Sequence, residues 1–82
     1  MTLKELRKGQ MAKVQEVLTD NTDIGNGFKT RLEAMGIVPG KPVQVMRSAW
    51  LGGPLAVRVG STTEIAIRRS EAELVMVEPK LS

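Results

Sequence analysis

At 82 residues the chain has room for one small domain, predicted here to span residues 1–82, with its core at about 6–78 and a frayed tail at 79–82. Hydrophobic residues make up 41% and charged residues 26%, which excludes a disordered chain, and the net charge of +3 is compatible with an acidic partner or nucleic acid. The chain contains no Cys, His or Tyr, which excludes disulfide frameworks, zinc ribbons and catalysis through a thiol or an imidazole.

The chain begins with a predicted helical turn at residues 2–6, in which Leu3 and Leu6 share one face. A strand is predicted at 10–18, where apolar and polar residues alternate. The alternation slips at 16–18, which indicates a β-bulge or the end of the strand.

A loop and then a helix are predicted next. Residues 19–27 are rich in Asp, Asn, Thr and Gly, which is typical of a loop. The helix is predicted over 26–35, because Phe28, Leu32 and Met35 fall at the spacing of one helical stripe.

The end of this helix has a clear chemical signal. Gly36 is placed to adopt the left-handed conformation that closes a helix, and Pro39 prevents the helix from continuing. Pro39 and Gly40 are predicted to form a turn.

Four more strands are predicted after this turn, since the apolar period changes to two. Glycine-containing turns separate the strands, at Gly52-Gly53-Pro54 and at 60–62. The Ser-x-x-Glu spacing of Ser70 and Glu73 is typical of a capping box and predicts one helical turn before the last strand. The predicted strands lie at 43–47, 55–59, 64–68 and 74–77.

The predicted fold is mainly β: a small, SH3-like, partly open barrel of about five strands, with one short helix inserted after the first strand. Five short strands cannot bury their apolar faces as a flat sheet, whereas a curled sheet can. We expect Phe28, Leu32 and Met35 to plug one opening of this barrel.

Two segments resemble ligand-binding loops but lack residues that such loops need. The segment 25–30 has a Gly-x-Gly spacing, but it lacks the third glycine of a dinucleotide loop and the Gly-Lys-Ser/Thr of a P-loop. The segment 20–23 begins a calcium-loop pattern, but Ile24 and Arg31 stand where an oxygen ligand and a glutamate are required. Both segments are interpreted as local turns that lead into the helix.

No catalytic residue, cofactor or metal site is predicted, and the protein is not predicted to be an enzyme. The chain has five methionines, but Met35 fits the core stripe, and Met46 and Met76 lie within predicted strands. No pair of carboxylates is set in apolar surroundings, as general acid–base catalysis would require.

Two surface features are candidate partner-binding sites. The first is the rim segment of Trp50, Leu51, Gly52, Gly53 and Pro54. A Trp and a Leu directly before a turn cannot both point into the barrel, and exposed Trp is enriched at binding hot spots. In the alternative interpretation, Trp50 folds over the barrel mouth as part of the core. The second feature is a basic set, which forms either a stripe or an ordinary solvated face: Arg47, Arg58, Arg68 and Arg69.

The segment 31–40 resembles the FeoA family, the small cytoplasmic proteins of bacterial ferrous iron transport. The family has an Arg-Leu…Met-Gly-x-x-Pro-Gly run, here formed by Arg31, Leu32, Met35, Gly36, Pro39 and Gly40. The strands and turns that follow also match in order, through Gly52-Gly53-Pro54, Ala66-Ile67-Arg68 and Glu71-Ala72, so the resemblance covers about Leu6 to Glu78. The fold is also similar to the C-terminal domain of iron-dependent repressors.

The resemblance implies a cytoplasmic accessory or regulatory protein that contacts a membrane ferrous iron permease and its GTPase domain. Such a protein would be peripheral to the membrane through its partner only, and weak self-association would be compatible with this role. The lack of His and Cys argues against intrinsic binding of a transition metal.

Three alternatives stay open at this point. An SH3-like nucleic-acid-binding module would use the basic strands, although the aromatic residues Phe28 and Trp50 do not make a base-stacking platform. A direct transition-metal-binding protein and an oligomer-forming structural subunit are the other two.

Overall fold

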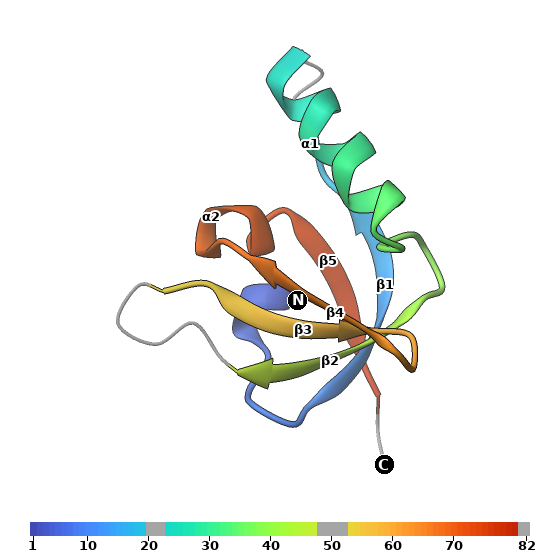
Figure 1. The fold of residues 1–82 in the computed structure, drawn as a ribbon, viewed down its shortest axis with the longest axis vertical. Coiled ribbons are helices and arrows are strands. Elements are labelled where there is room, and N and C mark those ends of the chain that lie inside the picture. The colour runs from blue at the N-terminus through green and yellow to red at the C-terminus, as the bar shows by residue number, and fades with distance from the viewer. Residues whose placement is uncertain (20–22, 48–52, 81–82) are drawn as a thin grey trace.

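The computed structural model describes residues 1–19, 23–47 and 53–80. Its five strands form one antiparallel sheet in the order β4-β3-β2-β1-β5, so β4 and β5 are the outer strands and do not pair with each other (Figure 1). The sheet is therefore curled but not closed, as the predicted partly open barrel requires. The strands are β1 (Met11–Val17), β2 (Pro42–Arg47), β3 (Leu55–Val59), β4 (Thr63–Ile67) and β5 (Val75–Pro79).

The core lies on the inner face of this curled sheet. In β3 the three inward residues are almost completely buried, and the two between them are partly exposed, so the predicted alternation is confirmed. None of the side chains that the structure describes as buried is polar or charged. The buried residues are Leu3, Leu6, Ala12, Val14, Val17, Leu32, Ile37, Val43, Val45, Leu55, Val57, Val59, Ile67, Ala72, Val75 and Val77.

Two register shifts bend the sheet. The pairing of β1 with β5 shifts between Val14 and Glu16, which agrees with the predicted irregularity near the end of this strand. The pairing of β2 with β3 shifts between Val45 and Arg47. Because bulges increase the local twist, these two positions help the sheet to curl over a core in which half of the buried residues are valines.

The two outer strands differ in how their free edges are treated. The outer edge of β5 is covered by the N-terminus, since Thr2 bridges Met76 and the N–H of Val77 donates to the carbonyl of Met1 at 2.8 Å. Within the described ranges, β4 has no backbone partner on the side away from β3.

Helix α1 (Asp23–Ala34) rises from the end of β1 and stands away from the sheet, and its C-terminal end lies nearest to the strands (Figure 1). The helix begins earlier than predicted, so the prediction of a loop through residue 27 was wrong. The loop was predicted from its glycine and polar composition, but the backbone is helical from Asp23 onward. Tertiary contacts at the other end then outweigh the cost of glycine in the helix.

The helix ends at Ala34, and Gly36 closes it in the left-handed conformation, as predicted. Gly36 has a φ of +94°, its N–H donates to the carbonyl of Glu33 at 3.0 Å, and the N–H of Ile37 donates to the carbonyl of Leu32 at 2.9 Å. This pair of bonds is a Schellman motif, in which the residue after the glycine packs back on the last helical turn. Leu32 and Ile37 are accordingly both fully buried.

The predicted plug is only partly right. Leu32 is fully buried, but Phe28 and Met35 are only partly buried against the core. Met35 lies at the end of the helix, and Ile37, which the helical stripe did not include, fills the core position instead. The Pro39-Gly40 turn forms as predicted: Gly40 has a φ of +90°, and the N–H of Lys41 donates to the carbonyl of Val38 at 3.0 Å.

The short helix α2 (Arg69–Ala72) precedes β5, and its cap differs from the prediction. Glu71 supplies the capping carboxylate, because its Oε1 accepts the N–H of Arg68 at 3.1 Å. Ser70 lies inside the helix, and Glu73 bonds to Lys4 instead of closing a capping box. The sequence spacing therefore predicted the helix correctly and its cap wrongly.

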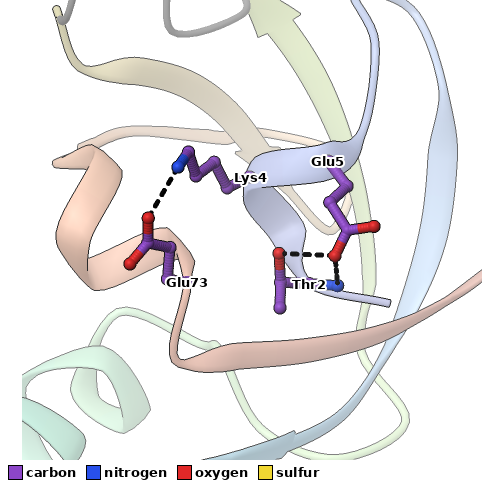
Figure 2. A network of polar contacts seen from close by, with 4 residues as sticks. All are labelled: Thr2, Lys4, Glu5 and Glu73. Atoms are coloured by element: carbon purple, nitrogen blue, oxygen red, sulfur yellow. Dashed lines mark hydrogen bonds and ion pairs between the residues drawn. The ribbon is translucent and has the colours of Figure 1, made fainter.

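The N-terminal turn is a 3-10 helix (Leu3–Glu5) that packs beside α2 (Figure 2). Leu3 and Leu6, which were predicted to share one face of this turn, are both buried in the core. The N–H and the hydroxyl of Thr2 both donate to Oε1 of Glu5, at 3.0 and 3.1 Å.

Candidate binding groove

An open groove of about 590 Å³ lies where helices α1 and α2 approach the end of the β3–β4 pair. Its walls are rich in arginine, and its apolar surface is made by two small side chains. We call it the arginine groove. It is lined by Arg31, Pro54, Ala66, Arg68, Arg69, Ser70 and Glu71.

Arg31 connects the two helices. Its guanidinium forms an ion pair with the carboxylate of Glu71, and its Cζ lies 5.8 Å from the centroid of the Phe28 ring. The Arg31 side chain remains about half exposed, so this pair stabilises the fold only modestly and is available to other ligands.

Glu71 is engaged on both of its oxygens. Oε2 takes part in the pair with Arg31, and Oε1 accepts the N–H of Arg68. The carboxylate that lies inside the groove is thus committed to holding α1 against α2.

A second ion pair borders α2 on its other side, between Lys4 and Glu73 at 2.6 Å (Figure 2). The hydrogen bond from the Lys4 ammonium, supported by the positive charges of Lys4 and Arg69, lowers the pKa of the Glu73 carboxyl. The Thr2 N–H that bonds to Glu5 likewise lowers the pKa of the Glu5 carboxyl. Both carboxylates are therefore ionised at neutral pH and already hydrogen-bonded.

Arg68 and Arg69 are different. Both are exposed, and their guanidinium groups form no hydrogen bond or ion pair with any other residue that the structure describes. A guanidinium presents a rigid fork of N–H donors that matches a carboxylate or phosphate. The groove therefore presents two guanidinium groups that form no ion pair with a described residue, although the charge of Arg69 also acts on Glu73.

The residues predicted from sequence divide between this groove and other places. Arg68 and Pro54 line the groove, and Gly53 directly precedes Pro54. Arg58 lies near the C-terminal end of β3 and forms an ion pair with Glu64 at 3.5 Å. The predicted residues Trp50, Leu51 and Gly52 lie outside the described residues.

Arg47 lies apart from the groove. It is exposed at the end of β2 and borders a shallow depression of about 250 Å³ that also contains Ala56 and Glu64. Between the Arg58–Glu64 pair and Arg68, the outer face carries the small side chains Ala56 and Ala66, which are paired across β3 and β4.

Arg31 was not predicted to be a binding residue, because its place in the Arg-Leu…Met-Gly run gave it a structural role. Its partner Glu71 is 40 residues away along the chain, so no local pattern could have shown the pair. Arg69 was in the predicted basic set, but the sequence did not show that it lines a groove together with residues of α1 and β4.

The described residues of the groove form no metal-ligating cluster. In the part of the chain that the structure describes, no three Asp or Glu side chains gather closely enough to hold a metal ion. None of the helices there is long and apolar enough to cross a bilayer.

A family model described as the FeoA domain matches residues 1–79. The chain belongs to the FeoA family. A sequence comparison with functionally curated proteins gave no match.

Solved FeoA structures resemble the chain along nearly its whole length. Stenotrophomonas maltophilia FeoA complexed with zinc is 35% identical, with a TM-score of 0.82 over 95% of this chain and 89% of that chain. It is described as a procaryotic SH3 domain protein suggested to be a bacterial ferrous iron transport activating factor. A FeoA described as an iron uptake regulatory protein is 29% identical, with a TM-score of 0.80 over 98% of this chain and 96% of that chain. The predicted SH3-like fold and FeoA resemblance are confirmed.

The fold is also shared more widely. A manganese-dependent transcriptional repressor in complex with manganese has a TM-score of 0.82 at 16% identity, over 98% of this chain and 36% of that chain. At this identity the likeness concerns the fold alone.

Proposed function

We propose that this protein is a cytoplasmic, non-enzymatic accessory protein of bacterial ferrous iron uptake that acts by contact with the membrane permease and its GTPase domain. The observation that carries the proposal is the FeoA family match over residues 1–79. It is supported by two FeoA relatives that are described in terms of iron uptake regulation and ferrous iron transport.

The physical character of the surface supports a role by contact. Polar and charged groups lie on the outer face, and the arginine groove offers uncommitted cations there. To regulate a permease, the protein must bind one state of its partner more tightly than another, because a ligand shifts an equilibrium only by its differential affinity.

Co-expression with the membrane permease tests this proposal. We expect the permease to co-purify with the tagged protein, and we expect deletion of the protein to change the rate of ferrous iron uptake while the amount of permease stays constant. Unchanged uptake at an equal amount of permease, together with no co-purification, would contradict the proposed function.

A further inference from the structure

We propose that the arginine groove binds a short acidic segment of a protein partner, whose carboxylates pair with Arg68 and Arg69. This inference rests on the proposed function in taking the partner to be a protein, and it adds the surface and the chemistry of the contact.

The balance of charge around α2 is the first argument. Four cationic side chains, Lys4, Arg31, Arg68 and Arg69, and two carboxylates, Glu71 and Glu73, lie on or beside α2, which leaves an excess of two positive charges. Both carboxylates are already engaged, Glu73 with Lys4 and Glu71 with Arg31. The excess therefore lies on the two arginines at the groove, and an anionic partner would complement it.

The second argument is the contrast with the other end of the same strand pair. Arg58 lies near the far end of β3, and its guanidinium forms an ion pair at 3.5 Å with the carboxylate of Glu64 on the neighbouring strand. Positive charge is thus concentrated at one end of the β3–β4 pair and does not form a continuous stripe. A concentrated pair of cations suits one or two carboxylates better than a long polyanionic backbone.

The shape of the groove is the third argument. Pro54 and Ala66 are small, so an extended segment can lie close to the surface between the arginines. Its volume of about 590 Å³ is sufficient for a few side chains of a peptide. None of the described residues that line the groove is aromatic, so this described lining offers no surface on which nucleic-acid bases could stack.

A titration of the full chain with a hexaglutamate peptide tests the groove directly. We expect the backbone amide NMR signals of Ala66, Arg69 and Ser70 to shift, and the affinity to fall as salt is added, because ionic contacts at a surface are screened. Arg68→Glu together with Arg69→Glu should weaken binding at least about tenfold. Both side chains are exposed, so the variant should keep its fold.

Arg7→Glu together with Lys8→Glu is the matched control. These two residues are also exposed, they lie outside the groove, and the double substitution changes the net charge by the same amount. We expect this control to bind hexaglutamate within about twofold of the wild type. Equal losses of affinity in both variants would show that net charge alone attracts the peptide. No binding of hexaglutamate by the wild type would show that the groove has no affinity for carboxylates. Either result overturns the proposal. The proposal is also overturned if the protein binds a single-stranded oligonucleotide more tightly than hexaglutamate and the groove variant abolishes that binding.

Pull-down of the permease separates this inference from the proposed function. Loss of permease binding in the groove variant, but not in the control, supports both. If the groove variant still binds the permease like the wild type, the proposed function stands and the groove is not the contact. If the groove binds hexaglutamate but the protein never associates with the permease, the carboxylate site stands and the proposed function fails.

Discussion

Strands β1, β2, β3 and β5 each contribute two or three buried side chains, whereas helix α1 contributes one, Leu32, among its residues 26–34. The burial that stabilises the sheet is thus distributed over four strands, whereas in residues 26–34 of the helix the fully buried side chain lies near the C-terminal end. Regions with few buried contacts open at lower free energy than the core. The difference indicates that α1 can open locally while the sheet stays folded.

Truncation of one leucine in each region should have the largest effect. Leu55→Ala and Leu32→Ala each remove a fully buried side chain, and each should lower the free energy of unfolding by about 2–5 kcal/mol. Chemical denaturation measures both losses. Hydrogen exchange should separate them, because Leu55→Ala should weaken protection throughout the sheet and Leu32→Ala chiefly in α1. Equal loss of protection everywhere in both variants would show that helix and sheet unfold as one unit.

Gly36→Ala tests the closure of the helix. The φ of +94° disfavours any residue with a Cβ, and an added Cβ would lie 3.3 Å from Cγ1 of Val59, so the substitution should cost about 1–2 kcal/mol. Gly27→Ala is the matched control within the helix, where an added Cβ meets nothing within 4 Å, and it should gain about 0.5–1 kcal/mol. Thermal unfolding should therefore give shifts of opposite sign, and a loss at both positions would contradict this account.

Loss of the ion pair between α1 and α2 should lower the free energy of unfolding less than loss of buried apolar area does. Arg31→Gln removes the contact with Glu71, but the Arg31 side chain is half exposed, so the cost should be less than about 1 kcal/mol. Arg58→Gln, which breaks the pair with Glu64, provides the comparison on the sheet. A cost for Arg31→Gln as large as that for Leu32→Ala would mean that the helix is held mainly by charge.

The pH dependence of stability should be the smallest effect. The pKa values of Glu5 and Glu73 are lowered in the folded protein, so their hydrogen bonds contribute stability above the ordinary glutamate pKa of about 4.3 and lose it as pH falls through the folded values. The melting temperature should therefore fall on acidification below about pH 4. Glu73→Gln should reduce this acid sensitivity, and an unchanged pH profile in that variant would show that the pair with Lys4 contributes nothing.

The comparison of the sheet with helix α1 also explains which elements the sequence could predict. The strands at 43–47 and 55–59 were predictable because each carries its own alternation of apolar residues. The helix end was predictable because Gly36 and Pro39 are local signals. The helix start at Asp23 was not, since the composition around it resembles a loop and tertiary contacts decide the outcome.

The candidate site was harder to predict than the fold. Arg68 and Pro54 were predicted to bind a partner, and both line the groove, but the pair of Arg31 with Glu71 depends on the packing of α1 against α2. Whether an arginine is neutralised, like Arg58 opposite Glu64, or forms no ion pair with a described residue, like Arg68 just after β4, depends on how the strands pair and where they end. That information lies in the strand register and not in any local pattern.

The covered edge of β5 has a consequence for self-association. Because Met1 and Thr2 occupy that side, further strands can join the described part of the sheet only beyond β4. Two copies that paired through their β4 edges would form a closed dimer, because neither copy would have a second free edge for a third. The arrangement thus opposes fibre growth, which requires each molecule to have two adhesive sides.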